Sequence, residues 1–118
     1  MSSLPNQVNF STPAGSQWAQ TFRMPDTDIT GLTWQFTIRT HATDTAQPAL
    51  VEVTTTVSAQ GYITVDTVAR TVQVVLAAAT TAALGKGARP YTLWSQPGTG
   101  QDAAWAEGIF NTQLVAIP

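Results

Sequence analysis

Chemically reactive side chains are scarce in this sequence of 118 residues. It contains no cysteine and one histidine, and it has a single lysine. The lack of cysteine excludes a disulfide framework, thiolate catalysis and a cysteine-ligated zinc site. The five cationic residues are scattered and the formal net charge is −2, so no basic surface indicates a nucleic-acid partner.

Charge of either sign is also scarce. Charged residues make up 10% of the chain, against roughly 25% in an average globular protein. Thr, Ala, Ser and Gln take their place, which predicts a neutral polar surface. Isolated soluble enzymes usually keep more surface charge than this. The composition therefore favours a module that neighbouring proteins largely cover.

Segments typical of secretion or membrane insertion are missing too. Residues 1–7 have neither a basic region nor an apolar core, so they do not resemble a secretory signal. The longest mostly apolar segment, from Val72 to Leu84, still contains polar residues and is too short to cross a bilayer. We expect synthesis in the cytoplasm without membrane insertion.

Strict alternation of large apolar and polar side chains is what the sequence does contain. Trp34, Phe36 and Ile38 alternate with Thr and Gln, which is typical of a strand with one buried face. We expect them to be buried together, with Trp18 in phase on its own strand. Facing strands would contribute Val53, Val65, Val74 and Leu93. Strands are predicted at about 17–23, 32–40, 51–57, 62–66, 71–76, 90–95 and 104–117.

These elements predict an all-β fold, an antiparallel two-sheet sandwich of about seven strands that is Ig-like or jelly-roll-like. Residues 77–84 are rich in Ala and end before Gly85, which predicts one short helix with a glycine cap. Gln60-Gly61 predicts a hairpin turn, and Gly108 a bulge in the last strand. Residues 16–118 would form this single domain.

Residues 1–15 have no sustained period and predict an extended N-terminal arm. Leu4, Val8 and Phe10 are its candidate anchors on a neighbouring protein. Because ordering such an arm costs roughly 1–2 kcal/mol per residue, we expect it to order only on a partner. The domain should then fold without residues 2–15.

Groups that resemble catalytic or metal sites are incomplete. Residues 26–31 match the first half of a calcium loop, but the twelfth position is Thr37 instead of the required Glu. His41 has Asp44 nearby but no evident nucleophile. Asp66 and Glu107 would act on glycosides only if the fold set them a few ångströms apart. We predict no catalytic residue, no metal site, no cofactor and no enzymatic activity.

Two tryptophans are candidates for the surface. Trp94 shares its strand face with Thr92 and Gln96, and Trp105 follows a glycine-rich turn. Either one would stack on a sugar ring or anchor a protein interface if exposed. The alternative for both is burial on the other sheet face.

Several motifs together carry a resemblance to a known family. They are Trp34-x-Phe36-x-Ile38, Gly61-Tyr62-Ile63-Thr64-Val65, Val74-Val75-Leu76, the helix ending at Leu84-Gly85, Tyr91-Thr92-Leu93-Trp94 and Gly108-Ile109-Phe110. From Ser16 to Ile117 the chain resembles small β-sandwich virion proteins of tailed bacteriophages, such as the N-terminal domains of baseplate upper proteins and tail-fibre-associated sandwich proteins.

The resemblance implies a structural role in a phage tail or baseplate, in several copies and in contact with other virion proteins. It brings no catalytic residues. Because the sandwich extends to Pro118 and leaves no room for a receptor-binding domain in this sequence, we expect an adaptor or accessory role. Two alternatives stay open: a capsid decoration protein, and a carbohydrate-binding module that recognises host-surface glycan through Trp94 or Trp105.

Overall fold

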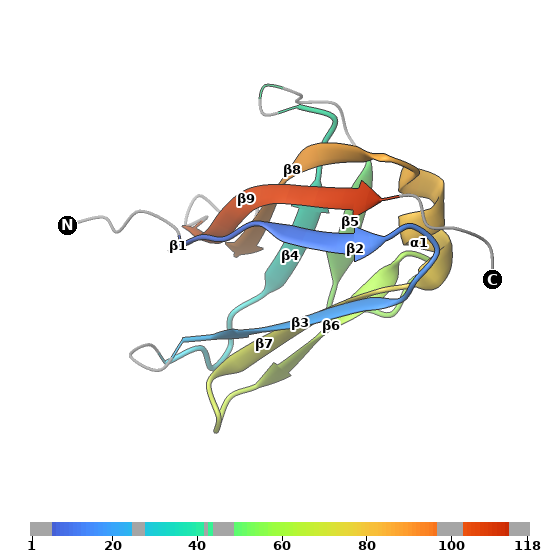
Figure 1. Cartoon of the computed structure of the whole chain (residues 1–118). Coiled ribbons are helices and arrows are strands. Elements are labelled where there is room, and N and C mark those ends of the chain that lie inside the picture. The colour runs from blue at the N-terminus through green and yellow to red at the C-terminus, as the bar shows by residue number, and fades with distance from the viewer. Residues whose placement is uncertain (1–5, 25–27, 42, 44–48, 97–102, 114–118) are drawn as a thin grey trace.

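Two β-sheets pack face to face, and one short helix closes an end of the sandwich (Figure 1). The computed structural model describes residues 6–24, 28–41, 43, 49–96 and 103–113. The larger sheet contains β1 (Asn6–Gln7), β2 (Phe10–Pro13), β9 (Ala103–Gln113), β8 (Gly87–Ser95), β4 (Trp34–Ile38) and β5 (Val51–Thr54). The smaller sheet contains β3 (Trp18–Arg23), β7 (Thr71–Leu76) and β6 (Gly61–Asp66), and the helix is α1 (Ala78–Leu84).

The strand order is that of an immunoglobulin sandwich of the variable type. Strands β9-β8-β4-β5 are neighbours in one sheet and β3-β7-β6 in the other. They correspond to the orders G-F-C-C′ and B-E-D of that fold. Every one of these pairs is antiparallel. The predicted all-β two-sheet sandwich is confirmed, and α1 is the one short helix among the residues that the structure describes.

The core lies between the sheets and contains the side chains predicted for it. Phe36 and Ile38 are fully buried and Trp34 is 2% exposed. Val53, Val74 and Leu93 are buried with them, while Val65 is partly buried against the same cluster. Trp18 is buried as well, with its ring edge-on to Phe110 at 4.9 Å between centroids.

The N-terminal segment belongs to the sandwich, so the expectation of a free arm is wrong for residues 6–13. Strands β1 and β2 run parallel to β9 along the same edge, with Phe10 paired to Phe110. The Phe10 ring packs on Trp18, Phe22 and Tyr91, with centroids 5.2–5.9 Å apart. Phe10 therefore anchors the segment on its own domain. Removing residues 2–15 would unpair β9 and uncover this aromatic cluster.

The predicted hairpin at Gln60-Gly61 is also wrong. Ser58 and Gly61 do exchange two backbone hydrogen bonds across a tight turn, but the flanking strands β5 and β6 belong to different sheets. The hairpin instead joins β6 to β7, where the Asp66 carboxylate accepts the N–H groups of Val68 and Ala69. Gly61 is required for close packing, because a Cβ there would lie 2.0 Å from the Val75 carbonyl oxygen.

Gln60 covers the free edge of β5, the strand at one side of the larger sheet. Its amide nitrogen donates to the Leu50 carbonyl at 3.2 Å, and its amide oxygen accepts from the Glu52 N–H at 3.1 Å. A side-chain amide thus occupies backbone groups that would otherwise pair with another strand. Strand β5 ends at Thr54, short of the predicted residue 57, and Val57 is 73% exposed.

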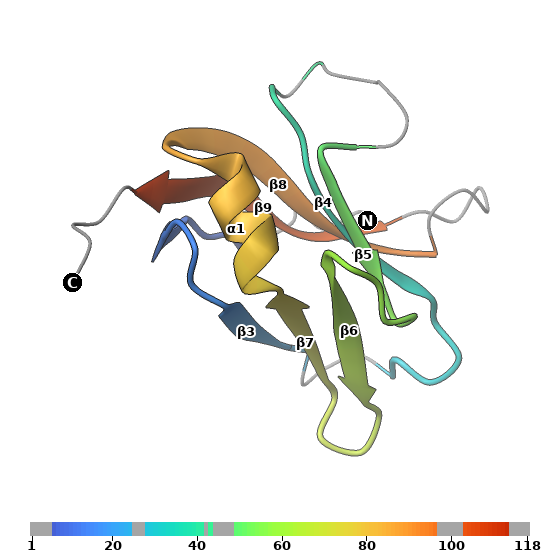
Figure 2. The same ribbon diagram turned by 90° about the vertical axis from the view of Figure 1, so that its right-hand side faces the viewer.

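Helix α1 bridges the two sheets at one end of the sandwich (Figure 2). Its buried face carries two threonines beside Leu84. The Thr80 hydroxyl donates to the Gln60 carbonyl at 2.8 Å, and the Thr81 hydroxyl donates to the Ser16 carbonyl at 2.7 Å. These bonds attach the helix to the turns before β3 and β6.

The bulge in β9 lies at Trp105, and the expectation that it lies at Gly108 is wrong. Leu93 pairs with Ala106 while Trp94 pairs with Ala104, so Trp105 is the extra residue. Gly108 has a different role. A Cβ there would lie 2.1 Å from the Val8 carbonyl oxygen, so only glycine lets the N-terminal segment approach β9 this closely.

Candidate functional site

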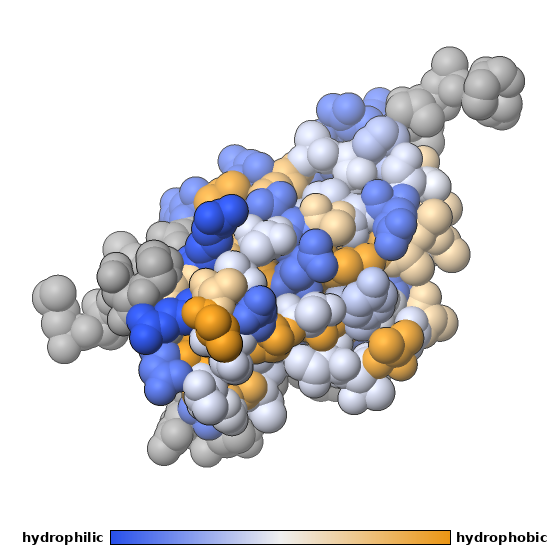
Figure 3. All heavy atoms as spheres, turned by 90° about the horizontal axis from the view of Figure 1, so that it is seen from below, coloured by the Kyte–Doolittle hydropathy of each residue, from blue (hydrophilic) through white to orange (hydrophobic). Residues whose placement is uncertain are grey.

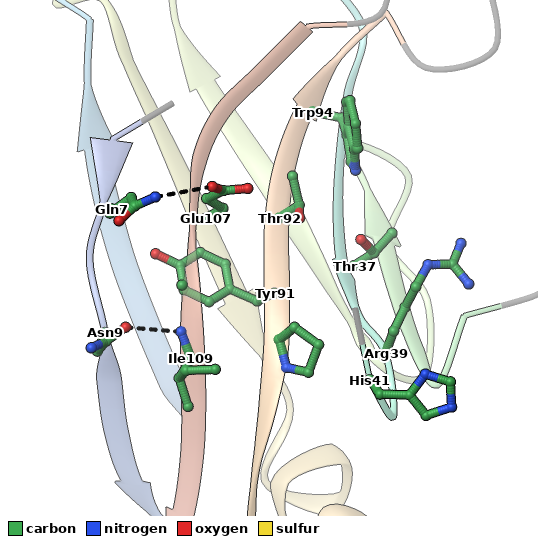
Figure 4. A pocket seen from close by; sticks show the side chains of 12 residues that line it. Gln7, Asn9, Thr37, Arg39, His41, Tyr91, Thr92, Trp94, Glu107 and Ile109 are labelled. Atoms are coloured by element: carbon green, nitrogen blue, oxygen red, sulfur yellow. Dashed lines mark hydrogen bonds between the residues drawn. The ribbon is translucent and has the colours of Figure 1, made fainter. Parts of the chain in front are cut away.

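A hollow of about 700 Å³ lies on the outer face of the larger sheet, across β4, β8 and β9 (Figure 4). We call it the outer-face hollow. Its floor is one cross-strand row in which Thr37 pairs with Thr92 and Thr92 pairs with Glu107. Gln7 of β1 extends the same row beyond Glu107. The floor is low because threonine side chains are short.

Larger side chains form the walls of the outer-face hollow. Trp94, two residues along β8 from Thr92, stands at one end (Figure 4). At the other end, Arg39 and His41, which follow β4, line one side, and Ile109 of β9 lines the opposite side. A short-chain row between tall side chains produces a depression on an otherwise flat sheet. This shape explains why the hollow lies here.

Hydrogen bonds order the β1 side of the hollow. The Gln7 amide donates to the Glu107 carboxylate at 3.3 Å, and the Ile109 N–H donates to the Asn9 side-chain oxygen at 2.9 Å. Beneath them the Tyr91 hydroxyl donates to the Val8 carbonyl at 2.6 Å. Burial, with a smaller contribution from the Glu107 charge, raises the pKa of Tyr91 to about 12. Tyr91 is therefore a neutral hydrogen-bond donor at any physiological pH.

Of the two tryptophans predicted as surface candidates, the structure places only Trp94 at this hollow. Trp94 is half-buried on the outer face. Trp105 is also half-buried, but its ring packs on Trp34 at 5.8 Å and its indole N–H donates to Ser95 at 2.7 Å. The bulge turns Trp105 toward the core. Of the predicted arm residues, Val8 is 43% exposed and Leu4 lies outside the described residues.

The groups weighed for catalysis or calcium binding are dispersed. His41 is exposed, with its Nδ1 3.1 Å from the Thr43 hydroxyl, and Asp44 lies outside the described residues. Asp66 closes the β6–β7 turn in the smaller sheet, whereas Glu107 belongs to the larger one. The structure does not bring these two carboxylates together as a pair.

The turn before β4 is organised by hydrogen bonds of its own. The Asp28 carboxylate accepts the Thr30 N–H at 3.0 Å, and this bond holds the pKa of Asp28 below its ordinary value of 3.8. Asp26 and Thr27, the other members of the calcium-like segment, lie outside the described residues. Among the residues that are described, no group of three or more His, Asp or Glu side chains is arranged to hold a metal ion.

A second surface is the outer face of the smaller sheet, which we call the small-sheet face. Three cross-strand rows compose it: Ala19–Val75–Tyr62, Thr21–Gln73–Thr64 and Arg23–Thr71–Asp66. The first two rows are uncharged. Seen from this side, hydrophobic residues form separate spots among polar ones (Figure 3). The face is built mostly of short side chains, and its charged residues, Arg23 and Asp66, belong to the third row alone.

Sequence reasoning named Trp94, Glu107 and His41 one by one but did not bring them together, and it proposed no role for Thr37, Thr92 or Arg39. Thr37, Thr92 and Arg39 were recognisable only as outward positions of their strands.

A scan against protein-family models finds no match, and a search of curated proteins finds no significantly similar sequence. Within the described part of the chain, no helix is long and apolar enough to cross a membrane.

Proposed function

We propose that this chain is a non-enzymatic structural module of a tailed-phage particle. It acts as a small tail or baseplate adaptor that assembles in several copies on other virion proteins. The observation that supports this most is the small-sheet face, with its two uncharged rows centred on Gln73 and Val75.

Such a face suits a permanent protein contact for an energetic reason. Burying a charged group costs far more than burying a hydroxyl or an amide that finds a hydrogen-bond partner. The cores of protein interfaces are accordingly depleted in charge. Thr21, Thr64 and Gln73 are exposed and bring both donors and acceptors to a partner. The scarcity of charge in the whole chain points the same way.

The test introduces one charge into this face. Thr64→Glu puts a carboxylate in the middle row, and Val68→Glu puts the same charge on the β6–β7 turn, where Val68 is 93% exposed. The gene for each variant replaces the wild-type gene in cells that produce the particle. Purified heads and tails are then separated and their proteins quantified by mass spectrometry.

We expect wild-type protein and Val68→Glu in the tail fraction in several copies, and a loss of about tenfold or more for Thr64→Glu. Urea unfolding of the purified variants checks that Thr64→Glu still folds. Wild-type protein in the head fraction would favour the capsid decoration alternative and contradict the tail placement. Wild-type protein absent from both fractions would refute the virion role. Normal incorporation of Thr64→Glu would refute the role of the small-sheet face.

A further inference from the structure

The outer-face hollow lies on the opposite sheet from the small-sheet face and is not needed for the assembly role. Its volume of about 700 Å³ falls within the roughly 300–1,000 Å³ typical of small-ligand sites. All of its floor residues are on paired strands of one sheet. Strands hold side chains in fixed relative positions, so the site exists before a ligand arrives.

The chemistry of the hollow is amphipathic. Trp94 offers a large apolar ring surface at one end. Thr37 and Thr92 bring hydroxyls, which donate and accept, and Glu107 brings a carboxylate, which accepts only. A ligand that satisfies this set must combine an apolar face with many hydroxyl groups. An apolar ligand would offer no hydrogen bond to the threonine hydroxyls and would leave the Glu107 carboxylate with the Gln7 amide alone.

The balance of charge narrows the ligand class further. Glu107 on β9 and Arg39, the residue directly after β4, lie on opposite sides of the floor (Figure 4). Their charges offset each other, so the hollow selects neither a polyanion nor a cation. A pyranose ring fits these requirements, since it carries C–H groups on its faces and hydroxyls around its rim. Such a ring packs on an aromatic side chain while its hydroxyls reach polar neighbours.

We propose that the outer-face hollow binds a neutral saccharide, with one sugar ring stacked on Trp94 and its hydroxyls bound by Glu107 and Thr92. Glu107 is already oriented by the Gln7 amide at 3.3 Å. The opening of the hollow toward solvent leaves room for the rest of a glycan chain. This site does not depend on the assembly role, because the two lie on different sheets.

The experiment uses the whole chain labelled with ¹⁵N. It is titrated with neutral trisaccharides of glucose, of galactose and of N-acetylglucosamine, and with an acidic trisaccharide that carries one sialic acid. Chemical-shift changes in the indole and backbone N–H signals report the site and the affinity. The variants are Trp94→Ala and Glu107→Gln. Tyr62→Ala is the matched control, because Tyr62 is a half-buried aromatic residue on the small-sheet face.

We expect at least one neutral trisaccharide to shift the signals of Trp94, Thr92 and Glu107. Its affinity should fall about tenfold or more in Trp94→Ala and in Glu107→Gln, and stay unchanged in Tyr62→Ala. No shift with any neutral trisaccharide at about 10 mM would overturn the proposal. So would tighter binding of the acidic probe, or unchanged binding by Trp94→Ala. A folded spectrum of each variant confirms that a loss reflects the site itself. None of these results depends on whether the protein enters a particle.

Discussion

The replacement of Gly108 by alanine tests how the N-terminal segment is held on the sandwich. A Cβ at this position would lie 2.1 Å from the Val8 carbonyl oxygen and 2.9 Å from the Asn9 side-chain oxygen. Ordinary contact distances are roughly 3.5 Å, so the segment must retreat by about 1 Å or more. The β9 backbone cannot yield instead, because β8 is paired along its other side.

That retreat would break three hydrogen bonds. The Val8 N–H donates to the Glu107 carbonyl at 3.0 Å, and the Ile109 N–H donates to Asn9 at 2.9 Å. The third bond runs from the Tyr91 hydroxyl to the Val8 carbonyl at 2.6 Å. Each contributes about 1 kcal/mol, so we expect Gly108→Ala to lower the free energy of unfolding by roughly 3 kcal/mol. Urea denaturation measures this loss.

Gly31→Ala is the matched control for this change. Gly31 has a φ of +78° and no atom within 4 Å of the added Cβ. Its left-handed backbone therefore lowers the free energy of unfolding of this variant by only about 1–2 kcal/mol. Amide hydrogen exchange at Val8 and Ile109 should accelerate in Gly108→Ala and not in Gly31→Ala. A Gly108→Ala protein no less stable than the control, with unchanged exchange at these two amides, would refute the reasoning.

Three further changes test the core, the buried tyrosine and the covered strand edge. Trp34→Ala removes a side chain that is 2% exposed and should cost roughly 3–5 kcal/mol of unfolding free energy in urea; a cost under about 1 kcal/mol would contradict its core position. The pKa of Tyr91 is raised from 10.0 to about 12, so the folded state holds this proton more tightly than the unfolded chain does. Its contribution to stability should therefore be constant below pH 10 and fall between pH 10 and 12, as measured by unfolding at each pH, and Tyr91→Phe should remove that fall. Gln60→Ala frees the Leu50 carbonyl and the Glu52 N–H at the edge of β5. The variant should therefore associate in a concentration-dependent way, which analytical ultracentrifugation measures. A variant as monomeric as the wild type would show that the edge of β5 does not need the Gln60 side chain.

Local patterns in the sequence determined the elements from β3 onward and much of the composition of the core. The alternation of Trp34, Phe36 and Ile38 predicts a buried strand face, and these side chains are buried. The alanine-rich run before Gly85 predicts the helix, and α1 ends there. Both signals are local, because side-chain direction along a strand or a helix depends only on the backbone of that element.

Only the tertiary structure decided which strands are neighbours. Strands β1 and β2 pair with β9 about a hundred residues away. Residues 6–13 have neither the length nor the alternation that would predict this pairing. The predicted hairpin failed for the same reason. Alternation shows that two segments are strands, but not whether the chain between them stays in one sheet or crosses to the other.

The outer-face hollow has this origin as well. Thr37, Thr92 and Glu107 each stand on a different strand. In the sequence the two threonines were visible only as outward-facing positions, and Glu107 only as a carboxylate considered together with Asp66. The bulge at Trp105 turns one surface candidate toward the core and leaves Trp94 at the hollow. The register between strands and the position of a bulge are set when the two sheets pack around a common core. The site therefore forms only after strands that are distant in the sequence have paired.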